Sequence, residues 1–175
     1  MIPTDNLRHL HDRLRSGITL VSQLEDRLHE RGAHAGKLEA FDRVADYLRD
    51  VVVPHLRAEL RALYPEAALV AGVDTDLVRR LTANCEELER QVNRVLRDRE
   101  RAHQGTCDQV SCRRHITTLV RLLRRHLHSV EDELLPHLDS ELREEDVLRI
   151  YERIEEASFD AEIASRPAAG VDGAA

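Results

Sequence analysis

Two stretches of this sequence are similar to each other, HLRAELRALYP at 55–65 and HLHSVEDELLP at 126–136. Each begins with a histidine, has a carboxylate about one helical turn later, and ends in a proline ten residues after the histidine. Residues about one turn apart share a face of a helix. Each pair, His55 with Glu59 and His126 with Glu131, can therefore approach one common ligand, and this recurring spacing indicates metal binding.

The composition predicts an all-helical protein with one core. A chain of 175 residues can bury one substantial core but is short for two domains. Aromatic residues make up only 3% and Trp is absent, while Leu, Val, Ala, Arg and Glu dominate, which favours helices over sheets. The net charge of -7 comes from interleaved Arg and Glu, as on solvated helix faces, so we expect no nucleic-acid partner.

The chain shows no sign of membrane insertion or secretion. Apolar runs are shorter than a membrane span, and the first residues lack the layout of a secretory signal. We therefore expect a cytoplasmic protein with no membrane partner. Its three cysteines cannot all pair within one chain, and thiols in a reducing compartment are more often reactive, metal-bound or buried than paired.

Apolar residues at helical spacing predict an up-down antiparallel four-helix bundle followed by a short extra helix. The prolines at 65 and 136 are expected to end the second and fourth helices, and Asp74 or Thr75 is expected to cap the third. The apolar stripes of the four helices cover residues 7–28, 41–63, 77–95 and 116–130. We expect the bundle in residues 1–140, the extra helix packed on it in 141–164, and a disordered tail in 165–175.

Polar residues interrupt the apolar stripes that face the bundle axis, where a charge or an imidazole must be paired or bound to a metal. His11 lies between apolar residues on the inward stripe of the first helix. The other inward polar residues are His55, Glu59, His126 and Glu131. Glu131 follows its histidine by five residues, so it reaches inward only if the helix is slightly unwound there, and Glu133 competes for its place.

In the order and placement of these motifs the chain resembles the hemerythrin family, including bacterial hemerythrin-like domains with a His/His/Glu cation-binding pattern. That family is a four-helix bundle holding two iron ions. Its ligands are a histidine from helix one, His-x3-Glu from helix two, histidine from helix three, and His-x4-Asp or His-x3-Glu from helix four. The resemblance covers about residues 5–140 and implies two non-heme iron ions, whereas a thiolate ligand, if the site has one, would favour zinc. The matching residues are His11, His55, Glu59, His126 and Glu131.

The third helix departs from the family pattern. It reads LTANCEELERQV at 81–92, with Cys85 on the inward stripe, Glu89 one turn later and no histidine. Cys85 is either a thiolate ligand or a small buried side chain, and Glu89 is the alternative ligand. This substitution argues against reversible dioxygen carriage. The complete set of candidate metal ligands is His11, His55, Glu59, Cys85, Glu89, His126 and Glu131.

A second group of potential ligands surrounds the connection between the third and fourth helices. His103, Cys107, Cys112 and His115 have the spacing H-x3-C-x4-C-x2-H. Four nitrogen and sulfur ligands within one short segment can hold a tetrahedral zinc ion. The sequence leaves open whether they do so.

The expected function is that of a non-heme iron protein that senses or handles dioxygen, peroxide or nitric oxide. Iron with histidine and carboxylate ligands and an open coordination position reacts with such molecules. One alternative is a di-iron peroxidase or catalase-like enzyme, in which Glu59 or Glu131 assists proton transfer. Another is a bundle that has lost its metal and serves as a helical interaction or thiol-redox module. Any signal would pass to a protein partner, and the oligomeric state stays open.

Overall fold

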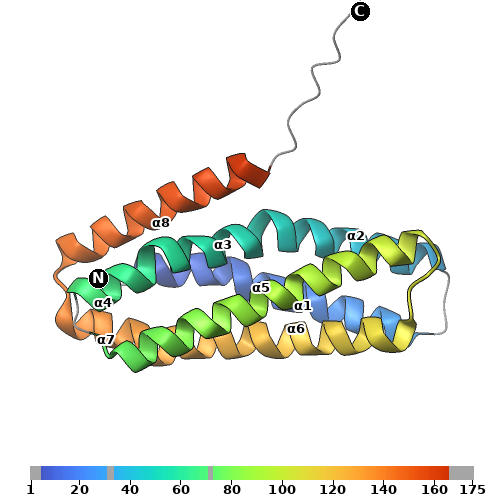
Figure 1. Cartoon of the computed structure of the whole chain (residues 1–175), viewed down its shortest axis with the longest axis horizontal. Helices are drawn as coiled ribbons and strands as arrows, with labels where there is room; N and C mark the ends of the chain where they lie inside the picture. Colours follow the sequence, from blue (N-terminus) through green and yellow to red (C-terminus); the bar gives the residue numbers. More distant parts are fainter. Residues whose placement is uncertain (1–4, 31–33, 71–72, 166–175) are drawn as a thin grey trace, which may run out of the picture.

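The computed structural model shows an antiparallel bundle of four helical rods with a further helix on its outer face (Figure 1). The structure describes residues 5–30, 34–70 and 73–165, and no β-strand occurs within these ranges. The predicted all-α class and up-down bundle are confirmed. Most of the predicted tail, residues 166–175, lies outside the described residues. None of the described helices is both long enough and apolar enough to span a membrane.

The rods differ in regularity. The first and third are each one continuous α-helix, whereas the second and fourth contain short π-helical segments, labelled η. The first rod is α1 (Asp5–His29) and the third is α5 (Thr75–His103). The second comprises α2 (His34–Tyr47), η1 (Leu48–Val52), α3 (Val53–Ala58), η2 (Glu59–Leu63) and α4 (Tyr64–Val70). The fourth comprises α6 (Gln109–Ser129), η3 (Val130–Leu134) and α7 (Leu135–Glu141), and α8 (Glu144–Ser165) follows it.

The core forms along regular seams of buried side chains. On α5 the buried positions alternate steps of four and three residues: Leu81, Cys85, Leu88, Val92 and Val95. This is the spacing that keeps one stripe of a helix facing its neighbours in a bundle. The same alternation on α6 runs through Leu119 and Leu123 to His126, which is 1% exposed. A histidine therefore occupies a position that the pattern otherwise gives to leucine.

The prolines of the second and fourth rods do not end their helices, so this prediction was wrong. The rods continue beyond Pro65 to Val70 and beyond Pro136 to Glu141. Proline lacks an N–H group, and its ring clashes with the carbonyl group four residues earlier. In both rods that carbonyl lies within a π-helical turn, η2 or η3, that ends two residues before the proline. The extra residue in such a turn moves the carbonyl away from the ring, so the helix can continue.

Asp74 caps α5, as one of the two sequence alternatives predicted. Its side chain accepts a hydrogen bond from the backbone N–H of Asp76 at 2.9 Å. At the other end of α5 the chain turns through Gly105, which adopts a left-handed φ of 70°. Asp108 then caps α6 by accepting from the backbone N–H groups of Val110 and Ser111. The two capped helices form the second hairpin of the bundle.

α1 and the second rod are in close contact at Gly17. The ring of Tyr47 lies over this glycine, and a Cβ atom added there would overlap the Cζ atom of the tyrosine. The Tyr47 hydroxyl donates a hydrogen bond to the carbonyl of Arg13 at 3.2 Å. A glycine inside a helix is usually unfavourable, so its presence here is explained by the room it leaves for the aromatic ring.

We predict that Gly17→Ala lowers the free energy of unfolding by about 1–3 kcal/mol, because the added methyl group displaces the Tyr47 ring. In a Tyr47→Ala background the same substitution should instead stabilise the protein by about 0.5–1 kcal/mol, the usual gain of alanine over glycine in a helix. Chemical denaturation of the four variants measures both effects. The interpretation fails if Gly17→Ala has the same sign in both backgrounds.

Candidate metal centre

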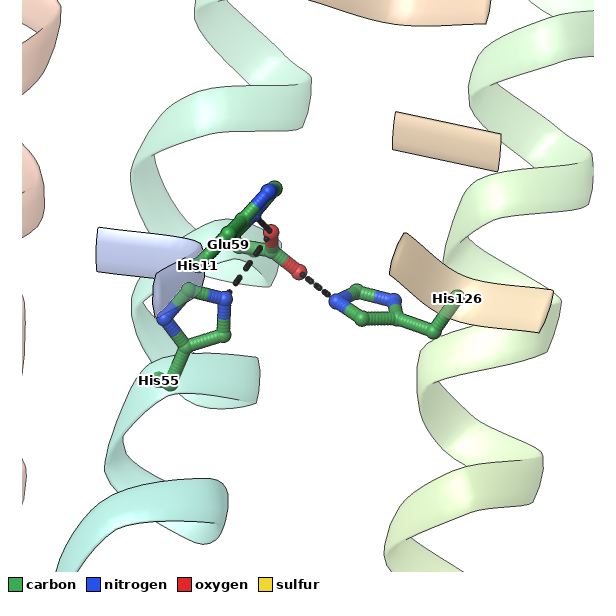
Figure 2. Close-up of side chains that lie close together, drawn as sticks. All are labelled: His11, His55, Glu59 and His126. Carbon is green, nitrogen blue, oxygen red and sulfur yellow. Dashed lines mark hydrogen bonds and ion pairs between the residues drawn. The ribbon is translucent and has the colours of Figure 1, made fainter. Parts of the chain in front are cut away.

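Four side chains from three rods meet inside the bundle (Figure 2). His11 comes from α1, His55 from α3, Glu59 from the first residue of η2, and His126 from α6. One donor atom of each lies within 4.8 Å of the others. Three of the four residues are at most 2% exposed, and the side chain of His55 is 10% exposed. This is the only such group of potential metal ligands among the described residues.

The carboxylate of Glu59 is the centre of the group. Oε1 lies 3.3 Å from Nε2 of His11 and 3.2 Å from Nε2 of His55. Oε2 lies 3.2 Å from Nε2 of His126. The three imidazole rings have centroids 5.2 to 6.1 Å apart, so they surround the carboxylate without stacking on one another. All three histidines thus present the same ring nitrogen to one small volume.

Glu131 lies beside this group, on the far side of the His11 ring. Its Oε1 is 3.1 Å from Nδ1 of His11, and its Oε2 accepts a hydrogen bond from Arg15. The π-helical turn η3 brings Glu131 there, because it supplies the local unwinding that the five-residue step from His126 requires. Carboxylates in this position commonly orient a metal-bound histidine. Glu133, the competing residue, instead forms an ion pair with Arg80 on the surface.

The third rod contributes Cys85 to the centre. Its thiol donates to Oε2 of Glu59 at 3.5 Å and lies 3.7 Å from Nδ1 of His126. Tyr64, which the sequence analysis did not single out, donates its hydroxyl to the same carboxylate oxygen at 3.0 Å. Its place within HLRAELRALYP, five residues after Glu59, was the one signal that could have identified it. Glu89 turns away and pairs with Arg57, with 3.2 Å between their closest atoms.

The surroundings of these groups fix their protonation states. Burial opposes ionisation of Glu59, but attraction to His126 and His55 and hydrogen bonds from His11 and His55 outweigh it, so its pKa lies well below the usual value. Burial lowers the pKa of His126 to about 4, although Glu59 acts in the opposite direction. Burial, reinforced by Glu59, raises the pKa values of Cys85 and Tyr64. At neutral pH the thiol and the phenol are therefore uncharged donors.

The contacts of the histidines show that a cation fits this centre. Nε2 of His126 is completely buried and has no hydrogen-bond partner in the structure, although it lies beside Glu59. A buried ring nitrogen that lies beside a carboxylate without a hydrogen bond to it is an unsatisfied polar group. A cation bound between the carboxylate and the ring nitrogens would satisfy both groups.

Comparison with known protein families agrees with this geometry. The family model described as the hemerythrin HHE cation binding domain matches residues 2–138. The chain belongs to this family. No curated protein and no solved structure gave a significant match. The matched hemerythrin domain contains all four rods except the end of α7, and α8 begins after it.

The structure does not support the zinc site that the sequence left open between the third and fourth rods. Cys107 and Cys112 form a disulfide, so neither sulfur is available as a thiolate ligand. The two histidines pair with acidic residues of neighbouring helices. Nε2 of His103 lies 2.8 Å from Asp42, and Nδ1 of His115 lies 2.6 Å from the buried Asp98. Each of the four residues therefore has a partner other than a metal ion.

We predict that protein purified without reductant will show one free thiol per chain after denaturation, because only Cys85 is unpaired among the three cysteines. Reduction before denaturation should raise the count to three. Titration with a chromogenic thiol reagent in the presence of a chelator measures both values. Three free thiols without reduction would contradict the disulfide and return the zinc site to consideration.

Proposed function

We propose that this chain is a non-heme iron protein in which His11, His55, Glu59 and His126 hold the ion. The observation that carries the proposal is the convergence of three imidazole Nε2 atoms on one buried carboxylate, at 3.2 to 3.3 Å from its oxygens. Burying these groups without a cation leaves Nε2 of His126 without a hydrogen-bond partner and is unfavourable. Iron is the metal that the hemerythrin family match suggests, and imidazole donors suit it.

The arrangement of the potential metal ligands supports one bound ion per chain. The resemblance to hemerythrins suggests two ions, but only one group of converging potential ligands, with four members, occurs among the described residues. Glu131 is positioned to hold the His11 ring rather than to complete a second set. We therefore propose a mononuclear site, and the metal content per chain is the measurement that separates it from a di-iron site.

The proposed role is to sense or handle dioxygen, peroxide or nitric oxide. Bound iron would supply redox chemistry and coordination positions that the four protein ligands leave free. The side chains around it hold protons close by: Tyr64 and Cys85 both donate to Oε2 of Glu59. Steady-state consumption of peroxide by the iron-loaded protein would favour the peroxidase or catalase-like alternative. Stoichiometric binding without turnover would favour a sensor.

We predict that His126→Ala loses iron, whereas His128→Ala retains it. The two histidines lie on the same helix, but His126 is 1% exposed within the centre, and the His128 side chain is 72% exposed and paired with Asp132.

Wild-type protein should be about 3 kcal/mol more stable than the chelator-treated form when the free iron concentration is 100 times the dissociation constant. Elemental analysis and thermal melting provide the measurements. Equal melting of the loaded and stripped wild type would contradict the site.

We predict that Glu131→Gln weakens iron binding by about 10- to 100-fold, because loss of the carboxylate releases the His11 ring from its fixed orientation. Glu133→Gln is the matched control: it lies in the same π-helical turn but pairs with Arg80 on the surface. Competition with a coloured chelator measures the affinities. A drop in the number of ions per chain, with unchanged affinity for those that remain, would instead identify Glu131 as a ligand of a second ion.

A further inference from the structure

α8 is the one described helix outside the four rods, and it lies across the second rod, over α3 and η2 (Figure 1). It follows α7 after a connection of two residues, 142–143. Its inner face buries Val147, Ile150 and Ile154, each at most 2% exposed. An ion pair between Arg153 and Glu66 fastens the middle of the helix to α4. The family match ends at residue 138, so α8 is an addition to the matched hemerythrin domain.

A small cavity separates α8 from the metal centre. Its volume is about 10 Å³, close to the space needed by one water molecule. His11, His55 and Glu59 form its polar floor. The walls are apolar and consist of Leu10, Leu63, Leu135 and Ile154. A molecule in this cavity would therefore touch three of the four proposed ligands of the ion and would otherwise meet only hydrocarbon.

Ile154 is the only residue of this lining that α8 contributes. Leu10, Leu63 and Leu135 belong to rods of the bundle. Ile154 is 2% exposed and belongs to the face of α8 that is buried against the bundle. A smaller residue at this position would therefore enlarge the space beside His11, His55 and Glu59 without changing the four rods.

We propose that Ile154, which α8 contributes, limits the size of the ligand that can bind beside His11, His55 and Glu59. The inference rests on the proposed iron site. The apolar walls favour uncharged diatomic molecules such as nitric oxide or dioxygen over larger or strongly hydrated ligands, because the walls offer no hydrogen bonds to replace those lost from water. α8 thereby adds size selection to a centre that the four rods already build.

The test compares iron-loaded wild type, Ile154→Ala and Ile150→Ala, with nitric oxide and imidazole as small and large ligands. Both substitutions remove the same atoms from the same buried face of α8, but only Ile154 lines the cavity. Ile154→Ala should strengthen imidazole binding by about 10- to 100-fold, the usual effect of a few methyl or methylene groups in a pocket. Nitric oxide affinity should stay within about threefold, and Ile150→Ala should match the wild type with both ligands.

Ligand binding is followed by optical titration, after the iron content of each variant has been measured. Ile154→Val provides a milder variant in case the alanine substitution prevents folding, and a smaller increase in imidazole affinity is expected from it. If Ile154→Ala and Ile150→Ala bind imidazole equally, the size limit at Ile154 is overturned while the iron site stands. If the wild type retains no iron, both the proposed function and this inference are overturned.

Discussion

One buried carboxylate, that of Glu59, is the group on which the centre of this molecule depends. Glu59 belongs to the second rod, where it also contacts His55. The other three rods contact it through His11 of α1, Cys85 of α5 and His126 of α6. An ionised group in a helical core is costly unless every oxygen has partners. The relative positions of the rods at this level are therefore set by polar contacts with one side chain, whereas apolar packing along the seams sets them elsewhere.

The sequence predicted the inward residues because helical periodicity assigns each position to a face without knowledge of the neighbours. His11, His55 and His126 fall on the apolar stripes, and the structure brings them together. The prolines were misjudged for a related reason. A proline excludes a regular α-helical turn before it, but whether the chain stops or forms a wider turn depends on packing against other rods. The same wide turn places Glu131 beside His11, so one feature explains both outcomes.

Two possibilities that the sequence left open, zinc binding by His103 and metal binding by Glu89, lose support because each residue has a partner far away in the sequence. His103 has metal-ligand spacing to the nearby cysteines, but its actual partner is Asp42, 61 residues away. Glu89 is held by Arg57, 32 residues earlier on the second rod. Local spacing identifies groups that can ligate a metal, but it does not show which opposite charge competes for them. Tyr64 was overlooked for the converse reason, since a tyrosine among leucines is usually core packing.

Cys85 lies where the resemblance predicts a histidine on the third rod. As a result, the two carboxylate oxygens of Glu59 have different surroundings. Cys85 and Tyr64 both donate to Oε2 of Glu59, so protein side chains occupy this side of the carboxylate. Oε1 faces His11 and His55, and these two histidines, with Glu59, form the floor of the small cavity beneath α8. Cys85 and His126 do not line that cavity. Cys85 and Tyr64 therefore lie on one side of the carboxylate, whereas the cavity bordered by Ile154 of α8 lies on the other side.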